Sequence, residues 1–246
     1  MEIAPGVHQL RALGCQVFAL LDEDITLIDA GYPGSGRWVL RQLRALGRAP
    51  ADVTRIILTH YHIDHRGAAD ELRRATGARV FVHAAEAPYL RGLCPYPNPI
   101  QTPPLSLLAG PLVAAMRGRP LQVDELTDGQ VLAPMGGVQV LHSPGHTRGS
   151  VTLLIPQRGL LFSGDSMGFR RGVLEVPDRN VSEDVELAKV SLERLAAIDV
   201  ETICFSHFGP LQRGARPALE RLVAQWSTEV PTPTRQGERS GGRRRE

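Results

Sequence analysis

Four potential metal ligands fall within six residues of the sequence, at His60, His62, Asp64 and His65. They directly follow residues 53–58, an apolar run that is typical of a buried β-strand. Imidazole nitrogens and carboxylate oxygens are the ligand atoms that zinc and similar divalent metals prefer. In extended backbone the side chains of residues i, i+2 and i+4 point the same way, so the first three ligands would converge and His65 would face elsewhere. The spacing therefore predicts two metal ions beside the end of a strand.

The alternative interpretation is an idle, solvated group of polar side chains on a loop. For a single histidine that alternative would be the better one. Three histidines and an aspartate at this spacing, directly after a strand, favour metal binding instead. His8, His83 and His142 have no such setting, and we interpret them as surface or packing residues.

The composition bounds the class of protein. The chain has 246 residues, of which 42% are hydrophobic and 22% charged, as is usual for a soluble globular protein. No uninterrupted apolar segment is long enough to span a membrane, and the first residues show no secretory signal. Cys15, Cys94 and Cys204 are widely spaced and form neither a disulfide framework nor a thiolate metal motif. We therefore expect a cytoplasmic protein.

The charge of the chain is concentrated at its end. The formal net charge is +2, but the twelve residues from Arg235 onward hold five arginines and two glutamates, which leaves about −1 for the rest. Such a nearly neutral body predicts no nucleic-acid partner, because nucleic-acid surfaces need a basic stripe. We expect one domain over residues 1–228 and a disordered basic tail over residues 229–246.

Short apolar strands alternate with helices along the chain. We expect strands at 16–21, 25–29, 53–58, 79–82, 138–141, 151–155, 160–162 and 202–205, and helices at 37–46, 68–75, 184–197 and 216–226. Ser182 is the expected N-cap of the third helix. Two strand-rich halves, each with covering helices, predict an α/β (α+β) fold with layered sheets between helices.

Residues 86–122 interrupt this alternation, because they are rich in proline and leucine. Loops of this length in compact domains are usually lids, binding segments or disordered segments. The apolar stretch at 105–116 favours a lid over an apolar substrate or an interface in a homodimer, and core packing is the weaker alternative.

Three further candidate ligands stand at the ends of apolar runs in the second half. His146 lies in a turn between two expected strands, Asp165 just past a third, and His207 just past a fourth. Each precedes glycine or small residues, a setting that gathers side chains at one edge of a sheet. Each alone has a structural explanation, but their joint appearance with the histidine cluster favours a shared site.

This combination resembles the metallo-β-lactamase fold superfamily, whose hallmark is His-x-His-x-Asp-His followed by a distant His, Asp and His. Thr59 before the cluster and Gly67 after it also resemble the glyoxalase II branch. The resemblance implies an αββα four-layer sandwich with the site along one edge of the sheets. It implies two divalent metal ions, zinc first, with iron or manganese as alternatives. The implied ligands are His60, His62 and His146 for one metal, Asp64, His65 and His207 for the other, and Asp165 between them, with Asp29 as a supporting residue.

The implied activity is hydrolysis of a thioester, a lactone or another activated ester, on the glyoxalase II-like or lactonase-like branch. A metal-bridging hydroxide would attack the carbonyl carbon, while Asp64 would orient the hydroxide or accept its proton. The expected partner is a small molecule with an apolar acyl group. Arg170 and Arg171 could bind a substrate anion, and a solvated loop is the alternative.

Two rival functions stay open. A mononuclear iron persulfide dioxygenase on the same fold would use His60, His146 and Asp165 on one iron. A non-enzymatic interaction protein would keep the fold and bind partners through the proline-rich segment or the basic tail. Glutathione specificity is not implied, because little beyond one helix follows His207, whereas glyoxalase II carries a C-terminal helical region.

Overall fold

The computed structural model describes residues 1–97 and 119–227. The first sheet has the strand order β1-β2-β3-β4-β5-β6-β7. Its strands are β1 (Glu2–Ala4), β2 (Val7–Arg11), β3 (Gln16–Leu21), β4 (Ile25–Ile28), β5 (Val53–Ile57), β6 (Arg79–His83) and β7 (Asp124–Leu126). Strands β1 to β4 pair antiparallel, whereas β4 to β7 pair parallel. The carboxyl ends of β4 and β5 therefore reach the same edge of the sheet.

The second sheet has the strand order β14-β11-β10-β9-β8. Its strands are β8 (Val131–Leu132), β9 (Val138–His142), β10 (Val151–Ile155), β11 (Leu160–Phe162) and β14 (Thr202–Cys204), and β12 (Gly168–Arg170) pairs with β13 (Val173–Glu175) in a separate hairpin. Strands β11 and β14 are parallel, so the residues that follow them lie at one edge of this sheet.

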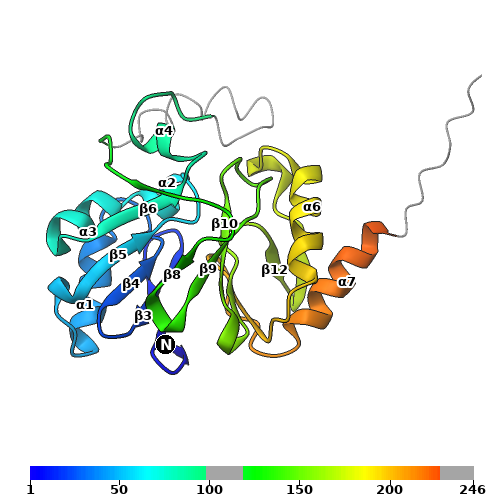
Figure 1. Cartoon of the computed structure of the whole chain (residues 1–246), viewed down its shortest axis with the longest axis horizontal. Helices are drawn as coiled ribbons and strands as arrows, with labels where there is room; N and C mark the ends of the chain where they lie inside the picture. Colours follow the sequence, from blue (N-terminus) through cyan, green and yellow to red (C-terminus); the bar gives the residue numbers. More distant parts are fainter. Residues whose placement is uncertain (98–118, 228–246) are drawn as a thin grey trace, which may run out of the picture.

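Helices cover the outer faces of both sheets. The helices of the described residues are α1 (Gly36–Ala45), α2 (Ile63–Arg66), α3 (Ala69–Thr76), α4 (Ala87–Leu90), α6 (Val185–Ala196) and α7 (Ala215–Ser227), with short 3-10 turns at Pro50–Asp52, Pro134–Gly136, Pro156–Arg158 and Arg179–Val181. Figure 1 shows α1 and α3 outside the first sheet and α6 and α7 outside the second, with the two sheets between them. The predicted αββα four-layer sandwich is confirmed.

Three apolar cores hold these layers together. One lies between the first sheet and its helices, where Leu43 of α1 packs near Ile56 of β5. The middle core joins the two sheets, and Phe18 of β3 meets Phe162 of β11 edge to face with ring centroids 5.1 Å apart. The third core lies between the second sheet and α6 and α7. Strands such as β4 and β10 are buried along their whole length because both of their faces are covered.

Two local expectations differ from the structure. Helix α6 is capped by Asp184, whose side chain accepts a hydrogen bond from the backbone N–H of Leu187 at 2.9 Å, and not by Ser182. The expected strand 25–29 ends at Ile28, because Asp29 adopts a left-handed conformation with φ of 62°. Within the described residues no helix is long and apolar enough to cross a membrane.

Candidate metal centre

The segment that carries the histidine cluster is not extended throughout. The chain leaves β5, reaches His62 in an extended conformation (φ −58°, ψ 147°), and then turns into the short helix α2. Because Asp64 lies in that helix, the expectation that His60, His62 and Asp64 converge on one point is wrong. The helix directs Asp64 and His65 together to a second point, beside His207.

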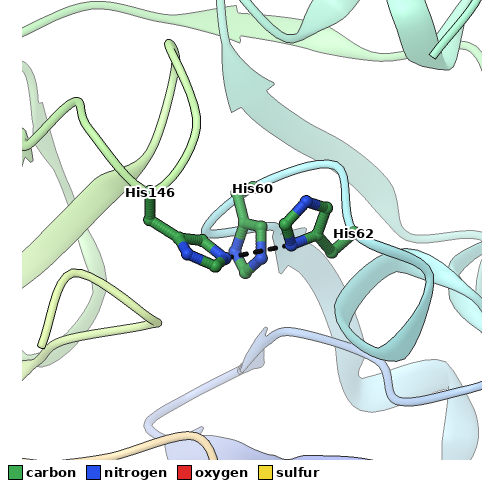
Figure 2. A group of neighbouring side chains, drawn as sticks. All are labelled: His60, His62 and His146. Carbon is green, nitrogen blue, oxygen red and sulfur yellow. Dashed lines mark hydrogen bonds between the residues drawn. The ribbon is translucent and has the colours of Figure 1, made fainter. Parts of the chain in front are cut away.

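The first ligand cluster consists of His60, His62 and His146. One ring nitrogen of each lies within 4.8 Å of the others. His146 Nε2 is 2.9 Å from His62 Nδ1, and Figure 2 shows the three rings facing one another. His60 follows β5 and His146 lies in the loop between β9 and β10, so this cluster joins the two sheets. All three residues are buried.

The second ligand cluster consists of Asp64, His65 and His207. The Nε2 atoms of the two histidines are 3.3 Å apart, and Asp64 Oδ2 is 3.4 Å from His207 Nε2. His207 follows β14, so this cluster too takes residues from both sheets. It is less buried than the first, because the side chains of Asp64 and His207 are 20% and 31% exposed.

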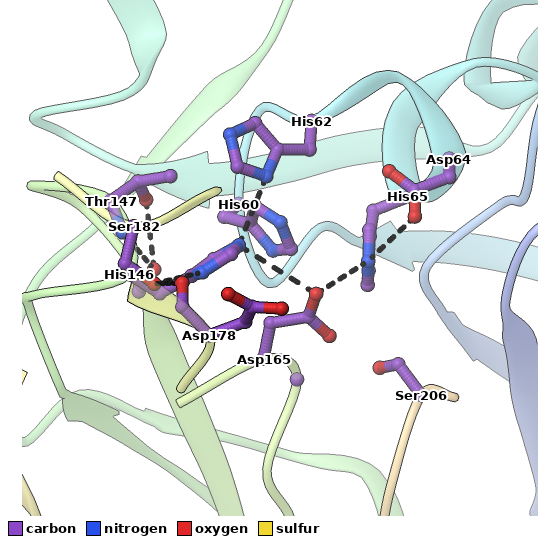
Figure 3. A network of polar contacts seen from close by, with 12 residues as sticks. His60, His62, Asp64, His65, His146, Thr147, Asp165, Asp178, Ser182 and Ser206 are labelled. Carbon is purple, nitrogen blue, oxygen red and sulfur yellow. Dashed lines mark hydrogen bonds and ion pairs between the residues drawn. The ribbon is translucent and has the colours of Figure 1, made fainter. Parts of the chain in front are cut away.

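Asp165 stands between the two clusters, as Figure 3 shows. Its Oδ2 atom is 3.6 Å from His146 Nε2, 3.5 Å from His65 Nε2 and 3.1 Å from His207 Nε2. Its other oxygen, Oδ1, is buried without a hydrogen-bond partner. A carboxylate in this position can contact a metal ion held by either cluster.

Asp29 fixes the orientation of two histidines. Its carboxylate lies 2.9 Å from His65 Nδ1 and accepts hydrogen bonds from the backbone N–H and the hydroxyl of Thr59. Because an ionised carboxylate only accepts, Nδ1 of His65 carries a proton, and in the neutral form of the ring Nε2 presents a lone pair. The Thr59 hydroxyl donates to Asp29, so its oxygen accepts from His60 Nδ1 at 3.1 Å, and Nε2 of His60 is likewise a lone pair.

His146 and His207, which lie far from the cluster in sequence, are oriented in the same manner. His207 Nδ1 lies 3.0 Å from the carbonyl oxygen of Gly14, which can only accept. His146 Nδ1 lies 3.1 Å from the hydroxyl of Ser182, which itself donates to the carbonyl of Asp178 at 2.7 Å. Both Nδ1 atoms therefore donate, so in the neutral form of each ring Nε2 presents a lone pair to the centre.

This donor set fits divalent cations. Lone pairs of neutral imidazoles that face one another at about 3 Å repel, unless a positive charge lies between them. Two buried atoms, His60 Nε2 and Asp165 Oδ1, have no hydrogen-bond partner among the described residues. Buried polar atoms without partners are costly, and a metal ion would satisfy both. The histidine clusters are therefore able to hold metal ions.

The electrostatics differ between the clusters. Burial, followed by the neighbouring histidines, lowers the pKa of His60 and of His62 well below the usual range, and burial also lowers that of His146. Burial acts in the same direction on His65, but Asp165, Asp29 and Asp64 outweigh it and raise the pKa of His65 well above the usual range. Neutral imidazoles in the first cluster are the ligand form of histidine.

A cavity of about 660 Å³ opens onto both clusters. Its wall includes Tyr32, Tyr61, Ile63, Arg66, Tyr96, Met167, Arg170, Val176, Val181 and Phe208, together with His62, Asp64, His146, Asp165 and His207. Of the two predicted substrate arginines, Arg170 lines the cavity and lies 3.8 Å from Glu175. Arg171 lies in the turn of the β12–β13 hairpin with φ of 50° and is not part of the wall.

Three residues of this site were missed in the sequence. Ser182 orients His146, although its position suggested a helix cap. Arg66 is buried in the cavity wall, with its guanidinium 4.6 Å from the centre of the Tyr96 ring. Glu86 is a fully buried carboxylate bonded to the backbone of Tyr61 and of the His146 loop. Their partners are too distant in sequence to be recognised. Only Arg66 had a signal in the sequence, because it directly follows the histidine cluster.

The proline-rich segment is described only at its ends. Helix α4 begins it, Tyr96 and Pro97 reach the cavity wall, and residues 98–118 lie outside the described residues. The predicted lid or dimer interface at 86–122 therefore stays a prediction, as does the basic tail at 229–246. His83 and His142 lie outside both clusters, stacked on each other with ring centroids 4.0 Å apart.

The sequence of this chain is similar to those of known proteins over most of its length. Residues 11–207 match the family model of the metallo-beta-lactamase superfamily. The probable metallo-hydrolase YflN of Bacillus subtilis is 27% identical over 92% of this chain and 93% of its own length. A hydroxyacylglutathione hydrolase of Cereibacter sphaeroides is 34% identical over 67% of this chain, but the match spans only 52% of that protein.

Solved structures show the same fold. A metallo-beta-lactamase family protein from Thermus thermophilus superposes with a TM-score of 0.71 at 23% identity, over 92% of this chain and 80% of that one. An archaeal metallo-beta-lactamase superfamily protein from Sulfolobus tokodaii gives a TM-score of 0.65 at 22% identity, over 96% and 91% of the two chains.

Proposed function

The chain belongs to the metallo-beta-lactamase superfamily, and from this premise we propose that it is a dinuclear metal-dependent hydrolase of thioesters, lactones or other activated esters. The observation that carries the proposal is the position of Asp165 between two ligand clusters, with one buried oxygen unpartnered. An intact second cluster favours two ions over the single iron of a persulfide dioxygenase.

Each proposed ion has its own ligands. His60, His62 and His146 would hold the first ion, Asp64, His65 and His207 the second, and Asp165 would contact both. When bound, the two ions would supply a water of lowered pKa and Lewis-acid stabilisation of negative charge. Seven protein ligands for two ions leave coordination positions open, which is typical of catalytic sites and not of structural ones.

The residues of the chain provide the rest of the chemistry. Asp64 lies in the cavity wall and is partly exposed, so its carboxylate can orient a nucleophilic water and hold the proton that it releases. Tyr32, Tyr61 and Phe208 line the same cavity as ligands of both clusters, and their aromatic rings occupy space that bulk water would otherwise fill. Arg170 at the cavity wall can contact a negatively charged part of a substrate, although Glu175 partly neutralises it.

The volume and lining of the cavity support a small substrate with an apolar acyl group. The volume of about 660 Å³ falls in the range of sites for small molecules. Apolar side chains such as Met167, Val176 and Val181 also stand in the wall. The similarity to a hydroxyacylglutathione hydrolase supports the hydrolase class, whereas its partial coverage of that protein leaves glutathione specificity unsupported.

Metal analysis and a substrate panel test the proposal together. We expect two divalent ions per chain and hydrolysis of at least one thioester or lactone in a panel of graded acyl length. One iron per chain with oxygen consumption on a persulfide would replace the proposal with the dioxygenase. A protein that carries two ions but cleaves no member of the panel would contradict the substrate class and leave the metal centre standing.

A further inference from the structure

Glu86 joins the two loops that carry the first ligand cluster. It lies between β6 and α4, and it is fully buried. Its Oε2 atom accepts a hydrogen bond from the backbone N–H of Tyr61 at 2.8 Å. Its Oε1 atom accepts from the hydroxyl of Thr147 and from the backbone N–H of Gly149, both at 2.8 Å. One carboxylate therefore satisfies three donors from two segments that are far apart in sequence.

These donors stand directly beside metal-ligand candidates. Tyr61 lies between His60 and His62 in the chain, and Thr147 follows His146, as Figure 3 shows for the latter pair. We propose that Glu86 is a positioning residue, which sets the spacing of His62 and His146 and so the affinity of the first cluster for its ion. This proposal rests on the proposed function, because it assumes that the first cluster binds metal.

The chemistry of the contact requires a carboxylate at this position. All three partners donate, so both oxygens of Glu86 must accept, and an amide could offer only one oxygen. Gly149 approaches so closely that a Cβ atom there would lie 2.5 Å from Glu86 Cγ. The backbone around Glu86 is therefore shaped for this side chain, and a buried carboxylate with three good hydrogen bonds gives a defined geometry.

The effect should be confined to the first cluster. His65 is held by Asp29, and His207 is held by the carbonyl of Gly14, so neither depends on Glu86. The first cluster has other supports as well. The backbone N–H of Val151 bonds to the carbonyl of Thr59, and that of Glu183 to the carbonyl of His146, which keeps the loops together when Glu86 is altered.

The alternative is that Glu86 stabilises the fold without influence on the metal. The two explanations predict different metal affinities of the two sites when Glu86 is replaced. Residues that orient metal ligands typically change affinity by about 10–100-fold when they are altered. A purely structural residue would lower the thermal stability of the metal-free protein and leave both affinities as they were.

The experiment compares Glu86→Gln and Glu86→Ala with Leu43→Ala. Leu43 is buried in the core under α1, so its truncation lowers stability away from the metal centre. The affinity of each of the two sites is measured by titration of the metal-free proteins with Zn²⁺ against a chelator. Visible spectra of Co²⁺ bound to each variant report the ligand geometry independently of activity.

We expect Glu86→Gln to weaken one of the two sites about 10-fold and Glu86→Ala about 100-fold, with the other site and Leu43→Ala unchanged. The altered Co²⁺ spectrum should belong to the weakened site. Thr147→Val, which removes one of the three donors, gives a milder variant if Glu86→Ala does not fold. Unchanged affinities at both sites, or equal loss at both, would overturn the proposal. A wild-type chain that binds fewer than two ions would instead overturn the proposed function.

Discussion

The two ligand clusters are built from similar side chains but differ in charge and exposure. In the first, His60, His62 and His146 are buried neutral imidazoles, and burial lowers the pKa of each. In the second, Asp64 contributes a carboxylate, and the side chain of His207 is 31% exposed at the cavity. The first cluster is thus a buried set of neutral ligands, whereas the second is more exposed and contains a carboxylate beside a histidine whose pKa is raised. We infer that the first positions an ion and the second handles the proton and the nucleophile.

Asp165→Asn should have the largest effect, because the carboxylate of Asp165 lies within 3.6 Å of the Nε2 atoms of histidines from both clusters. The amide keeps the shape but removes the negative charge that offsets two ions. Metal ions contribute several kcal/mol to transition-state stabilisation, so we expect hydrolysis to fall about a thousandfold or more. Metal content and kcat/KM are measured together, with Glu175→Gln as a control that removes another cavity carboxylate. Equal losses in both variants would refute the special position of Asp165.

Asp29→Asn should act on both clusters by changing tautomers. The new amide can accept from Thr59 or from His65, but its NH₂ group must then face the other donor. The disfavoured histidine would turn its protonated nitrogen toward the centre, where a lone pair is needed. We expect a loss of about 10–100-fold in affinity at one site or both, measured by titration with Zn²⁺. Unchanged affinities would mean that Asp29 does not control the tautomers.

Ser182→Ala should lower the metal affinity of the first cluster and leave that of the second unchanged. Its hydroxyl accepts from His146 Nδ1 at 3.1 Å and contacts no residue of the second cluster. We expect about a tenfold loss of affinity at the first site only. Ser191→Ala is the matched control, because its hydroxyl bonds the same loop at the carbonyl of Pro144, 2.7 Å away, without contact to a ligand. If both serine variants weaken the site equally, loop stability rather than ligand orientation explains the effect.

Much of the fold and the ligand types followed from the sequence, for physical reasons. Residues 151–155 and 160–162 were predicted as buried strands because short apolar runs bounded by turn residues are typical of such strands. The convergence of His60, His62 and Asp64 was wrong because four residues of helix α2 are too few to leave a periodic signal. Such short elements are set by tertiary contacts and not by local propensity.

The supporting residues were harder to find than the ligands. Glu86 bonds residues 25 and 61 positions away, at Tyr61 and Thr147, and no local pattern marks such a partnership. Arg170 and Arg171 are neighbours of the same residue type, yet only Arg170 lines the cavity, because it ends strand β12 whereas Arg171 lies in the turn that follows with φ of 50°. The burial of a polar side chain and its distance from the ligands determine whether it contributes to the site, and neither can be obtained from the sequence alone.

The smallest expected effect concerns the pH dependence of stability at His83, a histidine outside both clusters whose pKa is lowered by burial, as in the first cluster. Burial, followed by the stacked ring of His142, lowers the pKa of His83 to about 4, although Asp128 acts in the opposite direction. The unfolded chain, with a histidine pKa near 6.5, therefore binds the extra proton between about pH 6.5 and pH 4. Stability contributed by neutral His83 is present above that window and is lost as the pH falls through it.

His83→Phe keeps an aromatic ring on His142 but cannot take up a proton. Because His83 is only half-buried, solvent screening reduces the expected gain to about 1 kcal/mol of unfolding free energy at pH 5 relative to pH 7. Urea unfolding of the wild type and the variant at these two pH values measures the difference. The remaining acid sensitivity of the variant should come from the buried histidines of the first cluster, whose pKa values are lowered for the same reason. A variant that loses all acid sensitivity would show that the pKa values of those histidines are not lowered by folding, contrary to the buried neutral first cluster.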